Sequence, residues 1–299
     1  MLIDGPIRSV RDQLLLLRSL PAFAPIEDGV LSLLAEHARV RRVRRDTQLL
    51  TAGEPIHSAF IVLEGAIRWA RKDRPTQVAE RHQVVGWITL MARDVGGLDA
   101  AASEDSLVLE LPAETLELAL EDHFGIIRNL MRLGASGVVR ARGQLPVAPD
   151  RAPPVELGDE SGPRKTMVER VLAMRQAPIF RRCSVEAVIA LARNWRDLTV
   201  EPGEIIWRVG DESRYWVLVE YGRVTCTSES GQAVDVGSGF VLGIMDAIAQ
   251  LPRSYEARAA TRIVGSRIEV EAFMGVLEAH FDLARDFLAY LSATVLDGG

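Results

Sequence analysis

The sequence lacks the cysteines and the long apolar runs that a disulfide scaffold or a membrane protein needs. Its 299 residues include two cysteines, Cys183 and Cys226, both in apolar stretches that are typical of reduced, buried thiols. The amino terminus carries charge where a signal peptide needs an apolar core, and no window approaches the roughly 18 apolar residues that span a bilayer. We therefore expect a cytoplasmic protein without membrane insertion.

The chain also lacks an excess of positive charge and any catalytic signature. Its 35 basic and 41 acidic residues give a net charge of −6, which argues against a nucleic-acid-binding protein. The five histidines form no HExxH motif or metal-ligand cluster, and there is no P-loop or nucleophile elbow. We expect no enzyme, no metal and no cofactor.

A long internal repeat dominates what is present. The two halves of the chain align without a gap at one constant offset. The identical pairs include Gly53 and Gly210, Gly65 and Gly222, Gly86 and Gly243, His123 and His280, and Phe124 and Phe281. Two copies of one fold are therefore expected. We assign residues 1–139 to the first domain, residues 140–166 to a proline-rich, solvated linker, and residues 167–299 to the second domain.

Each copy shows the same order of predicted elements. A helical entry and an amphipathic helix are followed by short apolar segments bounded by Gly, Pro and Asp, which predict strands, and then by two closing helices. The regular strand spacing indicates a small β-barrel or roll. The fold class is α+β, mainly β.

The second copy carries motifs of a known family. It contains Pro-Gly-Glu at 202–204, Val-Gly-Asp at 209–211, a strand that ends in Gly222, and the run GIMDAIAQLPRS at 243–254. These residues resemble the cyclic-nucleotide-binding domain of catabolite-activator-type regulators, kinase regulatory subunits and gated channels. The resemblance covers roughly residues 8–139 and 165–296. It implies two tandem eight-stranded, jelly-roll-like β-rolls flanked by helices, an arrangement similar to kinase regulatory subunits.

The resemblance also implies a ligand site in the second domain. In the family's cassette, helix N-terminal amides and an arginine bind the cyclic phosphate, and a glutamate accepts the ribose 2′-hydroxyl. Here Gly243, Arg253 and Ser254 are in place, but Ile244 stands where the glutamate belongs. The implied site is a degenerate cassette with weak cyclic nucleotide binding at best.

The first copy departs further from the cassette. Gly86 matches the cassette glycine, but Trp87 replaces the glutamate and Gly96 replaces the arginine. We expect a vestigial pocket in which Trp87 points into the roll and fills it.

Two functions of different classes follow. The first is a regulatory or scaffold protein that acts through protein–protein interaction, with weak or no nucleotide binding. The alternative is a sensor of cAMP, cGMP or a related nucleotide in the second domain. Transcriptional regulation ranks below both, because no helix-turn-helix follows the second copy and DNA is not an expected partner. An unoccupied Arg253 is expected to pair with Asp246 or Glu256.

The last helix of each copy predicts an assembly contact. A 3-4-3-4 spacing, the seam of a short coiled coil, runs through Phe281, Ala284, Leu288, Leu291 and Val295. The first copy offers Phe124, Ile127, Met131, Gly134 and Val138. We expect the two helices to pair, within the chain or in a homodimer. The alternative is that each seam is buried against its own roll.

Two basic segments have structural interpretations. The segment RVRRVRR at 39–45 is interpreted as an edge strand protected by charge, with an anion-binding patch as the alternative. Arg181 and Arg182 give Ser184 the context of a kinase site, but its position favours a helix N-cap.

Overall fold

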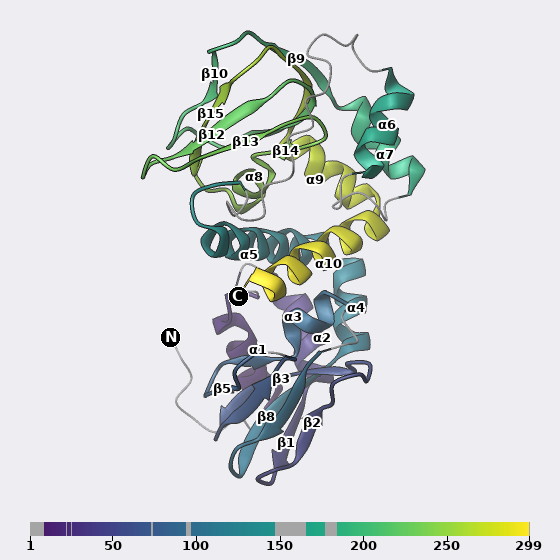
Figure 1. Ribbon diagram of the computed structural model, residues 1–299. Coiled ribbons are helices and arrows are strands. Elements are labelled where there is room, and N and C mark those ends of the chain that lie inside the picture. Colours follow the sequence, from purple (N-terminus) through teal and green to yellow (C-terminus); the bar gives the residue numbers. More distant parts are fainter. Residues whose placement is uncertain are drawn as a thin grey trace. The chain divides into compact units, whose positions relative to one another are not determined.

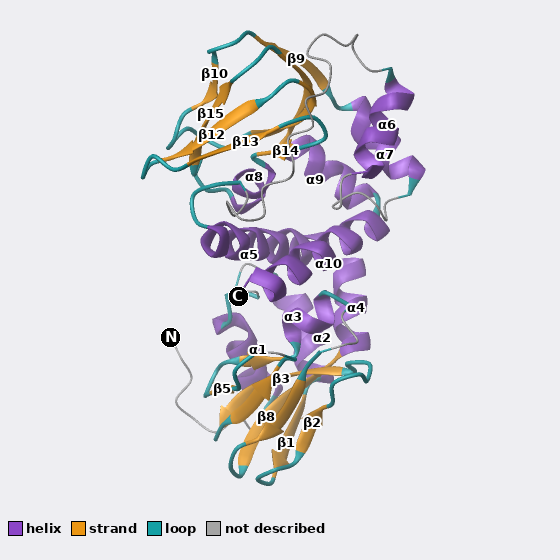
Figure 2. Cartoon of the chain, viewed as in Figure 1, coloured by secondary structure: helices purple, strands orange, loops and turns teal. Residues whose placement is uncertain are grey.

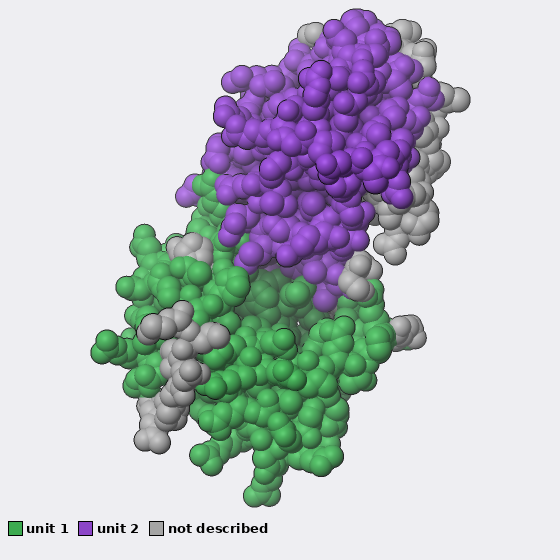
Figure 3. Space-filling view, turned by 90° about the vertical axis from the view of Figure 1, so that its left-hand side faces the viewer, with its two compact units in different colours: residues 1–130 green, residues 131–299 purple. Residues whose placement is uncertain are grey.

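The computed structural model describes residues 9–21, 23–24, 26–72, 74–93, 97–146, 166–176 and 184–298. It divides into two compact units, Met1–Leu130 and Met131–Gly299 (Figure 3). The division falls inside one long helix, α5 (Phe124–Arg142), so the end of this helix belongs to the second unit. Most of the proline-rich segment lies outside the described residues. At its start, α5 continues to Arg142 and Leu145 is buried, instead of forming solvated linker.

Over its described residues, the first unit contains eight strands and the helices around them (Figure 1). Besides α5, its helices are α1 (Val10–Ser19), α2 (Asp28–His37), α3 (Trp87–Met91) and α4 (Ala113–Asp122). Its strands are β1 (Arg39–Val43), β2 (Gln48–Leu50), β3 (Ser58–Glu64), β4 (Ile67–Ala70), β5 (Gln77–Ala79), β6 (Val84–Val85), β7 (Asp99–Ala102) and β8 (Ser106–Pro112).

Local sequence explains where the first helix begins and which face it buries. A capping box starts α1: the Ser9 hydroxyl accepts a hydrogen bond from the Asp12 amide at 3.2 Å, and the Asp12 carboxylate accepts one from the Ser9 amide at 3.0 Å. Leu16 and Leu17 are fully buried, and α1 packs against α2. These helices form part of the apolar layer beside the roll.

The strands of the first unit form two antiparallel four-stranded sheets, ordered β1-β8-β3-β6 and β2-β7-β4-β5. The central strand β3 is buried on both faces. Phe60 and Val62 belong to the roll's apolar core, whereas the intervening Ile61, also fully buried, does not. Because side chains alternate along a strand, Ile61 faces the opposite side of the sheet.

The second unit repeats this architecture (Figure 2). Its sheets have the orders β9-β16-β11-β14 and β10-β15-β12-β13. Its helices are α6 (Met167–Gln176), α7 (Val185–Arg193), α8 (Ile244–Ala249), α9 (Val270–Ala279) and α10 (Phe281–Gly298). Its strands are β9 (Arg196–Val200), β10 (Ile205–Trp207), β11 (Tyr215–Tyr221), β12 (Val224–Ser228), β13 (Ala233–Val236), β14 (Val241–Leu242), β15 (Tyr255–Ala259) and β16 (Ile263–Glu269).

The repeat extends to the irregularities of the backbone. The register shift between β3 and β8 at Val62 and Glu64 recurs between β11 and β16 at Val219 and Tyr221. Left-handed residues also recur at equivalent positions: Asp46 and Gly203, Gly53 and Gly210, Gly65 and Gly222, His82 and Gly239, Gly86 and Gly243, and Arg93 and Gln250. The expected fold, α+β with two tandem β-rolls flanked by helices, is confirmed.

Candidate functional site

The cassette of the second roll is built around α8. Gly243 occupies the N-cap position in a left-handed conformation, with φ of 73°, and every residue of α8 is buried. Gln250 ends the helix in a second left-handed turn, and the chain returns through Pro252 to Arg253 and β15. This path brings Arg253 back to the start of α8.

Arg253 is enclosed by protein groups. It is 1 % exposed, its Nη1 donates to the carbonyl oxygen of Gly243 at 3.0 Å, and its Nη2 donates to the carbonyl oxygen of Tyr215. The guanidinium carbon lies 4.0 Å from the ring centroid of Trp207 and 5.2 Å from that of Tyr215. A Cβ at position 243 would collide with Nη1, so only glycine fits there. Burial lowers the pKa of Arg253, but a guanidinium stays charged at neutral pH.

The expectation that Arg253 pairs with Asp246 or Glu256 is wrong. Asp246, which is fully buried, accepts hydrogen bonds from the Ser254 hydroxyl at 3.0 and 3.1 Å. Glu256 accepts from Arg258 at 2.9 Å. Two carbonyl oxygens and an aromatic face hold the buried guanidinium instead, because the turn after α8 delivers it to these groups.

The structure thus brings three predicted cassette residues together. Gly243 contacts Arg253 directly, and Ser254 is joined through Asp246 to the first turn of α8. Ile244 is 4 % exposed and has no polar group to replace the family's glutamate. The residues that the resemblance assigns to phosphate binding therefore lie together, and the position that it assigns to ribose binding holds an apolar side chain.

Three polar atoms around Arg253 have no hydrogen-bond partner in the described part of the chain. They are Nε of Arg253, Nε1 of Trp207 and the hydroxyl of Tyr255. The Trp207 ring meets the Tyr255 ring edge-on at 5.8 Å, so these groups lie in one region of the roll. Burial also raises the pKa of Tyr255, which keeps its hydroxyl protonated.

The pocket of the first roll is different. Gly86 keeps the left-handed N-cap position before α3, with φ of 86°. Trp87 is half-buried, and its ring meets Phe23 edge-on at 5.4 Å. The expectation that Trp87 fills the roll is therefore wrong: it opens α3 on the side of the α1–α2 connection, where Phe23 offers an apolar partner. Trp69 packs on the roll core, and Gly96 lies outside the described residues.

The predicted helix seam lies partly against α5 within the second unit. A Cβ on Gly134 would lie 3.5 Å from Cβ of Leu291, and a Cβ on Gly137 would lie 3.4 Å from Cγ2 of Val295. Ala284 and Leu288 are buried, and Phe281 is half-buried. Gly134 and Leu291 occupy equivalent positions in the two repeats. The two helices therefore contact each other through matching positions, as two copies related by a twofold axis would.

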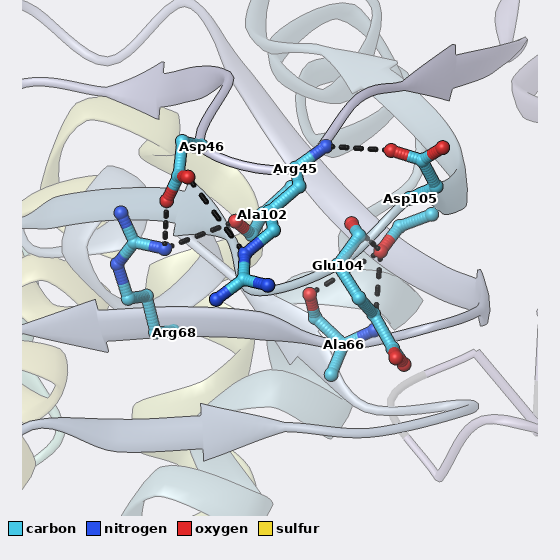
Figure 4. Close-up of polar contacts among 8 residues, drawn as sticks. Arg45, Asp46, Ala66, Arg68, Ala102, Glu104 and Asp105 are labelled. Carbon is cyan, nitrogen blue, oxygen red and sulfur yellow. Dashed lines mark hydrogen bonds and ion pairs between the residues drawn. The ribbon is translucent and has the colours of Figure 1, made fainter.

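The basic segment is an edge strand, as predicted. The first four residues of β1 are exposed, and β1 lies at the end of its sheet. Asp46 lies in the turn that follows β1, and its carboxylate is 2.8 Å from Arg68 of β4 and 3.8 Å from Arg45 (Figure 4). The backbone amide of Arg45 also donates a hydrogen bond to the carboxylate of Asp105 at 2.9 Å. Acidic partners therefore offset part of this charge.

The interpretation of Ser184 as an N-cap is confirmed, because its hydroxyl accepts from the Ala187 amide at 3.2 Å at the start of α7. Cys183 lies outside the described residues, and Cys226 is a buried free thiol. Across the part of the chain that the structure describes, no group of His, Cys, Asp or Glu could hold a metal ion, and no helix is long and apolar enough to cross a membrane.

Comparison with known proteins identifies the class. The family model of the cyclic nucleotide-binding domain matches residues 40–123 and 197–280, together more than half of the chain. The chain belongs to this family and carries two copies of its domain, which confirms the predicted resemblance.

Individual relatives are distant. The acetyltransferase Pat of Mycolicibacterium smegmatis is 28 % identical over 102 residues, 33 % of this chain, and the chain spans 31 % of its length. The regulatory domain of Toxoplasma gondii PKA with cAMP is 14 % identical, with 95 % of this chain and 96 % of that chain covered and a TM-score of 0.35. The regulatory subunit of a cAMP-independent protein kinase A from Trypanosoma brucei is 13 % identical, with coverages of 99 % and 89 % and a TM-score of 0.35.

Proposed function

We propose that this protein is a non-enzymatic regulator or scaffold that acts through protein–protein interaction, with weak or no binding of cyclic nucleotides. One observation carries the proposal: the arginine that would hold a cyclic phosphate is 1 % exposed and already engaged by two carbonyl oxygens and the face of Trp207. A phosphate must displace these groups before it can bind.

The missing ribose acceptor supports the same conclusion. Ile244 offers a nucleotide no hydrogen bond where the family has a glutamate. The loss of one such bond costs roughly 1–3 kcal/mol, or about 5- to 200-fold in affinity. Such a site distinguishes phosphorylated ligands poorly, since charge rather than sugar contacts decides binding.

The partner we propose is another protein, or a second copy of this chain, bound through the last helix of each domain. The contact of Leu291 and Val295 with α5 within the second unit supports helix pairing in one chain. The negative net charge and the predicted reduced thiols support a cytoplasmic protein that binds neither DNA nor the membrane interior.

Calorimetric titration tests the proposal. We expect no measurable heat with cAMP, cGMP or a cyclic dinucleotide, and at most weak, salt-sensitive binding that inorganic phosphate competes for. Arg253→Ala should change stability alone. Arg258→Ala, at an exposed arginine of the following strand β15, is the matched control. Tight, selective binding of one cyclic nucleotide that Arg253→Ala abolishes would overturn the proposal.

A sensor is the second candidate, and the unpartnered donors of Arg253 and Trp207 favour it. Acceptor oxygens of a phosphorylated ligand would pair with these buried groups and recover their desolvation energy. Under this alternative the titration gives saturable binding of one nucleotide, and Trp207→Phe, which removes the indole donor but keeps a ring, weakens it.

A further inference from the structure

The segment that follows α5 enters the interior of the second roll. After α5 ends at Arg142, Gly143 turns the chain with φ of 73°. Leu145 is 3 % exposed and belongs to the same apolar core as Trp207 and Tyr255, and Pro146 is buried as well. A leucine from outside the strands therefore completes the inside of this roll.

Polar contacts fasten the segment to the cassette. Nη1 of Arg142 donates to the carbonyl oxygen of Pro146 at 3.2 Å, which closes the turn around Leu145. Nη2 of Arg142 lies 3.5 Å from Oδ1 of Asp246, the fully buried carboxylate that also holds Ser254. One carboxylate thus connects α8, the start of β15 and the entering segment.

We propose that residues 142–146 are the resident occupant of the second roll's pocket, a peptide ligand supplied by the chain itself. Leu145 fills apolar space, and the ion pair between Arg142 and Asp246 fixes the segment in position. The inference rests on the proposed function, since a pocket filled in this way needs no nucleotide. A tether on this scale gives an effective concentration of about 1 mM, which favours the segment over a free ligand of equal affinity at micromolar concentration.

Thiol labelling of the 299-residue chain tests the occupancy. Leu145→Cys and the exposed neighbour Gln144→Cys are made in a Cys183→Ser background and treated with N-ethylmaleimide. Cys226 stays unreactive, because it is buried and its pKa is raised to about 12, chiefly by desolvation. We expect the Leu145→Cys thiol to react at least about 50-fold more slowly than the Gln144→Cys thiol.

The ion pair is tested in the same assay. Adding Arg142→Ala should speed the labelling of the Leu145→Cys thiol about tenfold, whereas Arg140→Ala, on an exposed arginine of the same helix, should not. Urea unfolding provides a second, independent test in case the cysteine variants fold poorly. Leu145→Ala should lower the urea midpoint, and Leu118→Ala, at a 58 % exposed leucine, should leave it unchanged.

The outcomes separate the two proposals. Equal labelling rates at positions 144 and 145, or a Leu145→Ala chain as stable as the native one, overturn the resident segment and leave the proposed function standing. Labelling of the Leu145→Cys thiol that accelerates and saturates with cAMP shows a nucleotide displacing the segment, which overturns the proposed function instead. Slow labelling that about 1 mM cAMP does not change supports both.

Discussion

The two rolls share a backbone but differ in what they place around the cassette. In the second roll, Trp207, Tyr215 and Tyr255 surround a buried arginine. The equivalent positions in the first roll hold Leu50, Ser58, Leu98 and Gly96. Asp246, which ties the second cassette together, has Thr89 as its counterpart. The first roll therefore has neither the charged nor the aromatic residues of this set, whereas the second roll has both, with Arg253 and Asp246 buried.

The difference shows what the fold needs and what the ligand site needs. Both cassettes keep a left-handed glycine before a short helix, because the turn from strand to helix requires it in either roll. A buried guanidinium, in contrast, needs hydrogen-bond acceptors and here also packs on aromatic rings. The first roll, which has no arginine at the equivalent position, has none of these aromatic residues either. The contacts of Arg253 with two carbonyl oxygens and the Trp207 ring therefore give this arginine a structural role that does not depend on a ligand.

The largest expected effect comes from Trp207, whose ring packs against Arg253 in the second cassette. Trp207→Ala should destabilise the second unit by about 3–5 kcal/mol, because it opens a core cavity and uncovers Arg253. Leu50→Ala at the equivalent position of the first roll should cost less, about 2–3 kcal/mol. Urea unfolding followed by circular dichroism measures both. Equal losses would mean that the arginine cage adds nothing, and Trp207→Phe should retain much of the stability.

A smaller loss is expected at Trp87. This ring is half-buried and packs on Phe23, so Trp87→Ala should cost about 1–2 kcal/mol, from part of its burial and one aromatic pair. The comparison with Trp207→Ala in the same unfolding assay is direct, since both remove an indole near a cassette. A loss as large as that of Trp207→Ala would restore the hypothesis that Trp87 fills the first roll.

The sequence predicted the architecture well, because glycine positions and apolar runs repeat at one offset and depend on local backbone needs. The family resemblance assigned Gly243, Arg253 and Ser254 to one cassette, and the structure places these residues close together, but the expected partners of Arg253 were wrong. The positions of Trp207 and Tyr215 beside Arg253 depend on strands far apart in the chain. The sequence did offer one signal for these contacts: the second copy has aromatic residues at positions where the first copy has none. Leu145 was missed because it lies in a proline-rich segment that otherwise looks solvated.

The left-handed positions give a third, smaller effect. Gly239 has φ of 83° and open space around its Cα, so Gly239→Ala should cost about 1 kcal/mol from backbone strain alone. The first roll tolerates His82 at this position, with φ of 69°. Gly275→Ala, at an exposed helical glycine of the same unit, should instead stabilise by about 0.5–1 kcal/mol. Changes of the same sign in both variants would contradict this account.

The smallest expected effect is a pH dependence of stability that the first roll has through Glu110. Burial alone would raise the pKa of Glu110, but hydrogen bonds from Arg41 at 2.8 Å and Ser58 at 2.8 Å, with the charge of Arg41, outweigh it and hold the pKa below 4.5. The second roll has Arg267 at the equivalent position, stacked 4.6 Å from the ring of Tyr215, and so lacks this titration.

Because the pKa of Glu110 is lower in the folded chain than in the unfolded one, its stabilisation is present above pH 4.5 and disappears as the pH falls through the folded value. Glu110→Gln should therefore lower the stability of the first unit by less than about 1 kcal/mol at neutral pH, as expected for a partly exposed ion pair. The difference from the native chain should vanish in acid, and Glu54→Gln, at an exposed glutamate of the same roll, is the matched control. Urea midpoints from neutral pH down to about pH 3 measure this. A difference that stays constant over that range would mean that Glu110 acts through its shape and not through its charge.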